Sequence, residues 1–291
     1  MQKKSKFTSI DRRADITYKE FVDQYQKKGL PVILANITDA WADPQIFTPE
    51  YLRKNFGDRT GNHPTHKYTV AELLDLTEKA TFDNPAPYPV KFMVKSTLPE
   101  MVPHMQPLDL NFIRPNWLKS KLLKNKLGNG DMDLHIGGAG NSYEMHKDTY
   151  DVHAWLIQLY GEKEVICFPW DEEPLMYPRK GGLLESRSPI VFTNPDYDKY
   201  PNFKKATPIK GKLKAGEVLY IPGGMWHTTV AYQQNMSTII NQVNETNYHA
   251  WKRDVYVYKA FHNKLKGAID YAAATVIGNV CRIGQLFGAK Y

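Results

Sequence analysis

The chain has 291 residues, of which 42% are hydrophobic, and this is ample for one substantial core. No uncharged run reaches the roughly 18 to 20 residues needed to cross a bilayer, and no apolar signal-peptide core follows the basic N-terminus. Its two cysteines, Cys167 and Cys281, are far apart, which favours a reducing, cytosolic environment over a disulfide-built secreted fold.

The positive charge is concentrated at the C-terminal end. The net charge is +7, and the last 41 residues carry +5 of it, from seven basic and two acidic side chains. Local positive charge attracts polyanions such as phosphorylated lipids or nucleic acid. The alternative is a solvated helical face that lysines keep soluble.

The predicted elements begin with an amphipathic helix over 17–28, for which Thr17 is a candidate N-cap. A second helix over 48–55 has Thr48 as its cap and Pro49 in its first turn. Other elements of the first half are expected over these ranges: a buried strand at 30–35, a helix at 69–79, a strand at 91–94 and a basic helix at 116–127.

Six later segments have the short, apolar, turn-bounded pattern of strands, and they are expected to form a barrel. They cover residues 133–136, 144–148, 154–160, 164–168, 218–221 and 237–243. A long insertion over 169–214 is rich in Pro, Tyr and Lys, and insertions of this length tend to be functional or mobile.

The last segment, 249–291, is helical in composition. Its apolar residues recur at spacings of 4, 3, 4, 4, 3 and 4, which places them in one stripe along a helix. They are Leu265, Ile269, Ala272, Val276, Val280, Ile283 and Phe287. The stripe is expected to pack on the barrel or on a second subunit. The alternative is an interfacial helix on an anionic membrane, with its lysines and Arg282 near the headgroups.

The segment His146-Lys147-Asp148 carries the strongest chemical signal. In an extended segment, residues i and i+2 point to the same side, so His146 and Asp148 can reach one ion. His227 follows a strand-like run and a proline stop, 79 residues after Asp148. An isolated His-x-Asp is common without a metal, but here both segments sit at strand ends beside turns. Two imidazoles and one carboxylate are the ligands of non-heme Fe(II) oxygenases.

The motif resembles that of the cupin-like, JmjC-type Fe(II)/2-oxoglutarate oxygenases. The segments at 21–34, 47–58 and 68–76 also resemble that family, so the resemblance covers roughly residues 15–250. It implies a mainly β fold with flanking helices and a double-stranded β-helix (cupin or jelly-roll) core. We expect one structural domain in three parts: 1–130 packing on the barrel, 131–248 as the core, and 249–291 as a basic helical segment.

The resemblance also implies the chemistry of the site. The catalytic and metal-binding residues would be His146, Asp148 and His227, holding Fe(II) with 2-oxoglutarate and O2 as co-substrates. Lys163, at the family's Gly-x-Lys position, would bind the far carboxylate of 2-oxoglutarate. Asn241 is the next candidate for a co-substrate contact.

Several neighbouring residues are also assigned expected roles. Tyr143 is a candidate hydrogen-bond donor to the co-substrate, with simple packing as the alternative. About two extra residues follow Asp148, so the family's usual asparagine falls near His153 or Ala154. Trp226 is expected to pack, with substrate contact as the alternative. His135 is expected in the core, with a position facing the cavity as the alternative. Tyr150 and Asp151 are expected near the mouth.

The substrate is the most open question. Size and layout also look similar to the Kdo 3-hydroxylases, cupin-like oxygenases that hydroxylate the Kdo sugar of lipopolysaccharide. An anionic glycolipid at the membrane surface is therefore the first hypothesis. The alternatives are a protein side-chain or tRNA hydroxylase of the same family and, outside enzymes, a non-catalytic cupin scaffold.

Expected partners are a small-molecule or glycolipid substrate, an anionic membrane surface, and a second copy through the C-terminal helices. Nucleic acid is less favoured. The expected location is the cytoplasm, with a peripheral position at the inner membrane.

Overall fold

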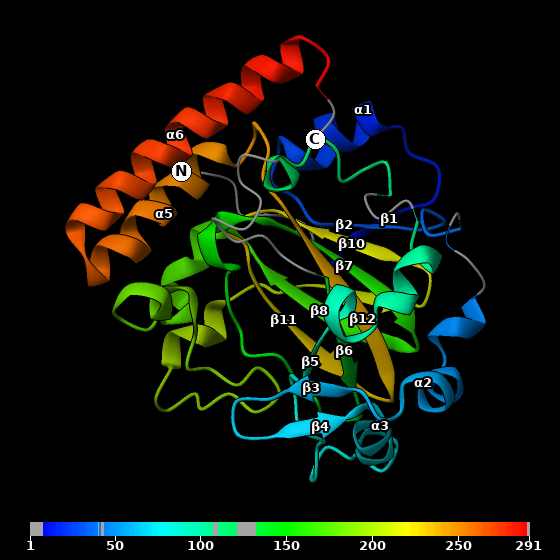
Figure 1. Ribbon diagram of the computed structural model, residues 1–291. Helices are drawn as coiled ribbons and strands as arrows, with labels where there is room; N and C mark the ends of the chain where they lie inside the picture. The colour runs from blue at the N-terminus through cyan, green and yellow to red at the C-terminus, as the bar shows by residue number, and fades with distance from the viewer. Residues whose placement is uncertain (1–7, 40, 42–43, 107–109, 121–131, 290–291) are drawn as a thin grey trace.

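Two β-sheets form the centre of the molecule in the computed structural model, which describes residues 8–39, 41, 44–106, 110–120 and 132–289 (Figure 1). Leu156 and Leu219 of the larger sheet share one buried apolar cluster with Val165 and Leu213 of the smaller sheet. The sheets therefore pack against each other through their apolar faces. This is the double-stranded β-helix that the sequence predicts.

The larger sheet has nine strands, and its neighbours pair antiparallel except for β1 and β2. In spatial order they are β1 (Asp11–Arg13), β2 (Val32–Leu34), β10 (Val218–Ile221), β7 (His153–Tyr160), β12 (Asn235–Gln242), β6 (Asp133–Gly137), β5 (Lys91–Met93), β3 (Thr60–Asn62) and β4 (Lys67–Thr69). The N-terminal part of the chain thus supplies both edges of this sheet.

The smaller sheet has three strands, β11 (Trp226–Ala231), β8 (Glu162–Phe168) and β9 (Ile209–Lys214), in that spatial order. Both of its pairings are antiparallel. β11 was not predicted from the sequence, although its first residues carry the second histidine of the motif. It also did not predict β9, which lies at the end of the long insertion.

Short helices flank the sheets. α2 (Pro49–Phe56) and α3 (Val70–Glu78) confirm two predicted helices, and Thr48 caps α2 by accepting a hydrogen bond from the Tyr51 N–H. The predicted helix over 17–28 is α-helical only in α1 (Tyr18–Phe21). It then widens into a π-helix, η1 (Val22–Gln26). Outside the insertion, the described chain also contains the short helices α4 (Val94–Thr97), η2 (Pro44–Phe47), η3 (Pro99–His104), η4 (Trp117–Lys119) and η5 (Thr149–Asp151).

Two further predicted elements differ from the structure. Residues 144–148 form no strand. They run extended with isolated bridges at His146, because their partners come from two separate places, His227 and the insertion near Arg187. The basic helix predicted over 116–127 is observed only as η4, and its second half lies outside the described residues.

The insertion is packed against the small sheet. It contains three 3-10 helices, η6 (Trp170–Met176), η7 (Gly182–Ser186) and η8 (Pro201–Lys205). Met176, Ile190 and Phe203 are buried in one cluster with Phe168 and Trp226. The burial of Trp226 confirms its predicted packing role.

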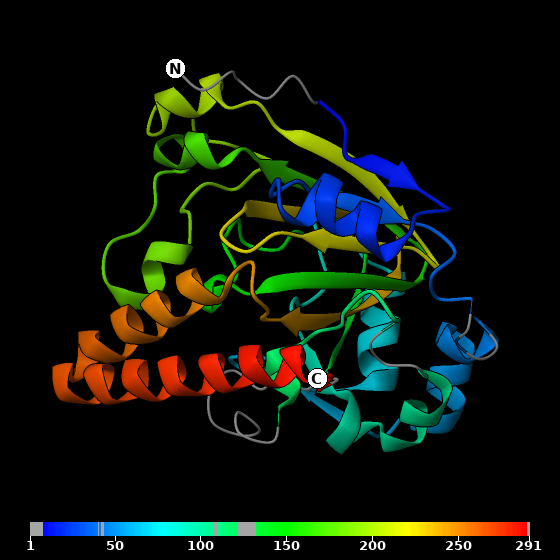
Figure 2. The ribbon, with the colours of Figure 1, turned by 90° about the horizontal axis from the view of Figure 1, so that it is seen from above.

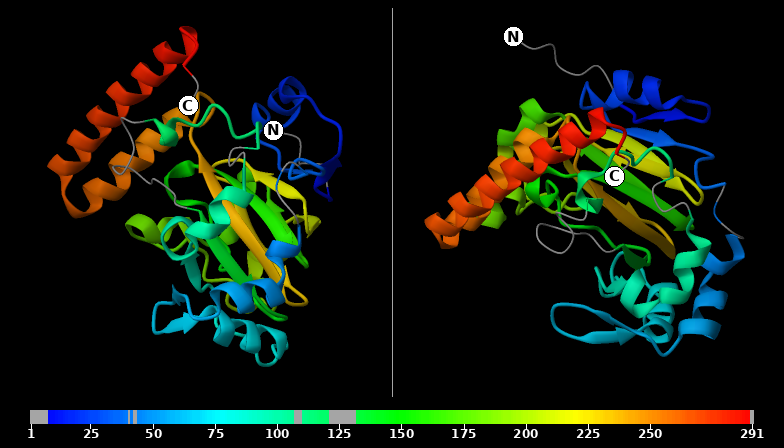
Figure 3. Two further views of the ribbon diagram at one scale, coloured as in Figure 1. Left: turned by 45° about the vertical axis from the view of Figure 1, so that its right-hand side comes forward. Right: turned by 45° about the horizontal axis from the view of Figure 1, so that its top comes forward.

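The C-terminal segment folds into a helical hairpin of α5 (Tyr248–His262) and α6 (Lys264–Leu286). α5 lies nearer the sheets and α6 lies outside it (Figure 2). The hairpin and the α2–α3 region lie at opposite ends of the molecule (Figure 3). Within the described chain, no helix is both long and apolar enough to cross a membrane.

The face of α6 that packs on α5 is made of small residues. Its buried positions are Gly267, Ala274, Gly278 and Cys281. A Cβ at Gly278 would lie 2.0 Å from the Tyr248 ring, so only glycine fits this contact. The predicted apolar stripe is on the other face and is exposed to solvent. Its expected packing on the barrel is therefore wrong.

Candidate metal centre

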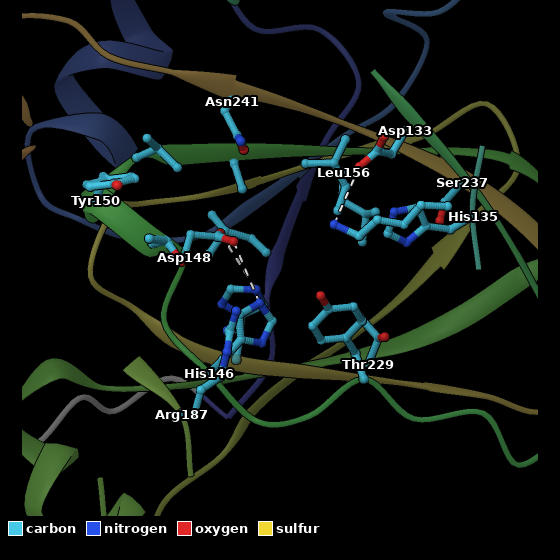
Figure 4. Close-up of a pocket in the computed structure, with 18 of the residues that line it drawn as sticks. Asp133, His135, His146, Asp148, Tyr150, Leu156, Arg187, Thr229, Ser237 and Asn241 are labelled. Carbon is cyan, nitrogen blue, oxygen red and sulfur yellow. Dashed lines mark ion pairs between the residues drawn. The ribbon is translucent and has the colours of Figure 1, made fainter. Parts of the chain in front are cut away.

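His146, Asp148 and His227 meet as predicted. One ligand atom from each lies within 4.8 Å of the others. The His146 Nε2 atom is 3.6 Å from one Asp148 carboxylate oxygen, and the His227 Nε2 atom is 3.8 Å from the other (Figure 4). A transition metal bonds nitrogen and oxygen ligands at about 2.0–2.2 Å, so atoms at these separations can share one ion.

Backbone pairing brings the two histidines together. The His146 N–H donates to the His227 carbonyl at 2.9 Å, and the His227 N–H donates to the His146 carbonyl at 2.8 Å. Such a pair is a narrow antiparallel bridge, and both side chains project to the same side. The imidazole centroids are 4.3 Å apart. His146 lies in the extended segment after β6 and His227 lies in β11.

Each imidazole is also fixed in orientation. The His146 Nδ1 atom is 2.7 Å from the Glu144 carbonyl, and the His227 Nδ1 atom is 3.0 Å from the Met225 carbonyl. A carbonyl only accepts, so each Nδ1 donates and each Nε2 keeps its lone pair. Metal-binding histidines are held by the same second contact. The donor set therefore fits a divalent transition metal such as Fe(II).

The charges suit metal binding as well. Burial raises the pKa of the Asp148 carboxyl, but His227, His146 and Arg187 outweigh it and lower that pKa to about 2. Burial and the neighbouring His146 lower the pKa of His227 to about 4, against the opposing effect of Asp148. At neutral pH Asp148 is an anion and His227 is neutral, which are the forms that bind a metal.

The triad opens into a cavity of about 400 Å³ between the sheets. Lys163 on β8 lines the same cavity, is 3% exposed and donates from Nζ to the Ser237 hydroxyl at 2.8 Å. Among the described ion pairs it has no carboxylate partner. Burial lowers the pKa of Lys163 to about 7. A buried cation of this kind is stabilised by an anion that enters the cavity.

The other predicted contact residues fall into two groups. Asn241, Tyr143 and Tyr150 line the cavity, and Figure 4 shows the Asn241 amide pointing into it from β12. His153 does not line it. Its Nδ1 accepts from the Gly223 N–H at 2.9 Å and its Nε2 lies 2.8 Å from the Thr246 hydroxyl. Ala154 lines the cavity without a polar side chain, so neither position replaces the family's usual asparagine.

One residue of the cavity lining takes the position named as its alternative, and another was not predicted. His135, expected in the core, lies beside Ser237 in the cavity, because Ser237 on β12 pairs in register with His135 on β6 (Figure 4). Successive side chains of a strand point to opposite faces of the sheet. Because Leu134 and Ile136 face the core cluster, His135 between them is expected to face the cavity. Trp251 on α5 also lines the cavity, and no local pattern identifies it, because a helix from another part of the chain brings it there.

Arg187, from the insertion, was also missed. It lines the cavity beside His146, and its Nη1 atom is buried without a hydrogen-bond partner among the described residues. Its Nε atom is 3.9 Å from a Glu144 carboxylate oxygen. A guanidinium nitrogen left in this position suits an oxygen acceptor from a ligand.

Comparison with known proteins agrees with this geometry. Residues 65–248, more than half of the chain, match the family model described as "Cupin-like domain". The chain therefore belongs to that family, and its fold and its His-Asp-His ligand set agree with those of the JmjC-type Fe(II)/2-oxoglutarate oxygenases.

Three relatives illustrate the similarity. Arginine-specific demethylase JMJ22 of Arabidopsis thaliana is 26% identical over 82% of this chain and 47% of its own length. Lysine-specific demethylase 8 of Xenopus tropicalis is 24% identical over 76% and 49%. JmjC domain-containing protein 8 of Homo sapiens is 28% identical over 76% and 79%. The chain spans about half the length of the first two.

Proposed function

We propose that this chain is an Fe(II)- and 2-oxoglutarate-dependent oxygenase that oxidises a C–H bond of a protein side chain. One observation supports the proposal. The His146–Asp148–His227 triad, in which both Nε2 lone pairs are available to a metal, shares a cavity with the buried Lys163 ammonium group, which has no carboxylate partner among the described residues. A metal ligand set and an anion site in one enclosed space suit a chelating dicarboxylate.

Each residue has a distinct task in this proposal. The triad would hold the metal, and Lys163 with Ser237 would bind the far carboxylate of 2-oxoglutarate. Bound Fe(II) would supply the activation of O2, so that substrate C–H, O2 and 2-oxoglutarate give substrate C–OH, succinate and CO2. Leu156, Ile221 and Ile239 line the cavity with apolar side chains, which limit the entry of water.

The relatives favour a protein substrate. Two of them are named as an arginine-specific and a lysine-specific demethylase. Oxidation of an N-methyl carbon and hydroxylation of a side-chain carbon begin with the same C–H step, so one site serves either outcome. Arg187 is the candidate substrate contact, because its buried Nη1 has no hydrogen-bond acceptor in the described part of the chain. The Kdo and tRNA hypotheses gain no support from these names.

The test is turnover with Fe(II), 2-oxoglutarate, O2 and a library of protein-derived peptides, some methylated at Arg or Lys. We expect succinate formation that depends on the peptide. The peptide should either gain one oxygen atom or lose a methyl group as formaldehyde. Asp148→Ala should abolish turnover, and His63→Ala, which changes a histidine outside the cavity lining, should retain it. Turnover only with Kdo-bearing lipid A or with tRNA would overturn the protein substrate. No turnover with any substrate would favour the scaffold.

A further inference from the structure

One face of α6 presents a row of apolar side chains to solvent. All seven positions of the stripe predicted from the sequence are exposed, including Leu265 at 71%, Val276 at 62% and Phe287 at 86%. The opposite face is the one that packs on α5. The stripe thus has no cover within the described chain, and a continuous apolar surface of this kind marks an interaction site.

The residue spacings of the apolar stripe are the same in both directions along α6. Its spacings of 4, 3, 4, 4, 3 and 4 are symmetric about Val276. When two such helices lie antiparallel, with a twofold axis at Val276, Leu265 meets the second copy's Phe287. In the same way Ile269 meets the second copy's Ile283. Each apolar position therefore faces an apolar position, as an isologous interface requires.

We propose that α6 packs antiparallel against α6 of a second copy of this chain. The size of the surface agrees. A helix of 23 residues is about 34 Å long. The stripe and the adjoining Leu286, itself 80% exposed, leave on the order of 800 Å² for one partner to cover, which is one side of a standard stable interface.

Charge placement selects the antiparallel arrangement. Lys264 and Lys266 begin α6. In an antiparallel pair, Lys264 and Lys266 of one copy lie beside the C-terminal end of α6 of the other copy. The free carbonyls at that helix end carry partial negative charge. A parallel partner would instead set these lysines against their own copies, which repel.

The two arginines of the C-terminal segment favour a second copy over an anionic membrane as the occupant. Arg282 is paired with Glu245, and Arg253 is paired with Asp151 and Asp254. Two of the seven basic residues of the C-terminal segment are therefore paired with carboxylates within the molecule, including Arg282, the one arginine of α6, and they are less available to lipid headgroups.

The interface would also support the cavity. α6 packs on α5, and α5 carries Trp251 into the cavity wall. Tyr258 of α5 also contacts Tyr150 at the cavity mouth, with ring centroids 5.3 Å apart. A second copy docked on α6 would hold this wall in place.

The first test is the solution mass of the full chain by light scattering. We expect twice the 33.5 kDa of one chain. Val276→Glu, which places two carboxylates at the axis, should halve that mass. The matched control is Val191→Glu, because Val191 is similarly exposed at 57% but lies in the insertion. It should remain a dimer. Circular dichroism establishes that both variants are folded. A monomeric wild type, or a dimeric Val276→Glu, would overturn the proposal.

Cysteine cross-linking tests the orientation. The two native cysteines are buried, so introduced thiols report the contact. A mixture of Leu265→Cys and Phe287→Cys chains should form the mixed disulfide dimer, whereas Leu265→Cys alone should not cross-link. Cross-linking of Leu265→Cys alone would indicate parallel helices. A monomer that floats with phosphatidylserine vesicles, and loses this in Val276→Glu, would assign the stripe to a membrane instead.

Discussion

Lys163 and Ser237 join the two sheets across the floor of the metal cavity, with the ammonium group donating to the hydroxyl at 2.8 Å. Lys163 belongs to the small sheet and Ser237 to the large one. The Ser237 hydroxyl accepts one hydrogen bond from the Lys163 ammonium group but carries no negative charge. The buried ammonium group therefore has no counterion among the described residues. This contact makes the floor of the cavity selective for anions.

Replacing Lys163 by Met should weaken 2-oxoglutarate binding, because the carboxylate would lose its cation in a buried site. Loss of a buried charge partner costs about 2–5 kcal/mol, so the KM for 2-oxoglutarate should rise at least about 30-fold. Metal affinity, measured by anaerobic titration, should be unchanged. Lys214→Met, which removes an exposed lysine of β9, is the control. An unchanged KM in Lys163→Met would place the carboxylate elsewhere.

The pH dependence of 2-oxoglutarate binding should follow the same lysine. The pKa of Lys163 is lowered to about 7, so its charge is present below pH 7 and is lost as the pH rises. In metal-loaded protein, affinity should fall above pH 7 by up to about tenfold per pH unit. Lys163→Arg keeps its charge and should remove this slope. Isothermal titration calorimetry from pH 6.5 to 8.5 measures the 2-oxoglutarate affinity of both proteins. Affinity that is constant or rises with pH would contradict the assignment.

His227→Ala should abolish tight metal binding and leave the fold intact. The imidazole supplies one of three ligands, while the β11 pairing uses the backbone and survives the change. Fe(II) affinity should fall at least about 100-fold, with little change in the melting temperature without metal. His262→Ala, at the exposed end of α5, should bind metal as the wild type does. Tight binding by His227→Ala would show that the ion sits elsewhere.

Gly278→Ala should destabilise the C-terminal hairpin. The added Cβ would lie 2.0 Å from the Tyr248 ring, and relief requires α6 to move from α5. Overpacking of this kind costs about 1–3 kcal/mol, even after the helix propensity gained with alanine. Asn279→Ala, on the exposed side of the same turn, should be neutral or slightly stabilising. Thermal unfolding compares the two, and equal melting temperatures would contradict the close contact.

The metal ligands could be predicted from the sequence because each lies in a short local pattern. His146-x-Asp148 is such a pattern, and His227 follows a proline-ended strand. The strand predicted over 144–148 was wrong for a non-local reason. The Lys147 N–H donates to the Ser186 carbonyl, and the Met145 carbonyl accepts from the Ser188 N–H. Both partners come from an insertion that local patterns cannot place.

The apolar stripe of α6 is a second case in which the sequence predicted the element but not its tertiary contacts. Its period predicted a helix correctly, because helical geometry is local. Which face meets the rest of the chain depends on size as well as polarity. Gly267 and Gly278 allow α5 to approach closely, so the small face is buried and the large apolar face is left outside. Arg187 and Trp251 reach the cavity through tertiary contacts, which no spacing in the sequence encodes.

The most direct test of the oxygenase assignment is an anaerobic titration of the full chain with Fe(II) and then 2-oxoglutarate, followed by visible absorption. The account predicts a charge-transfer band that appears only when both are present. The band should be absent in His146→Ala and retained in His63→Ala. Metal-loaded wild type that shows no band on addition of 2-oxoglutarate would contradict the oxygenase site and the roles given to Lys163 and Asn241.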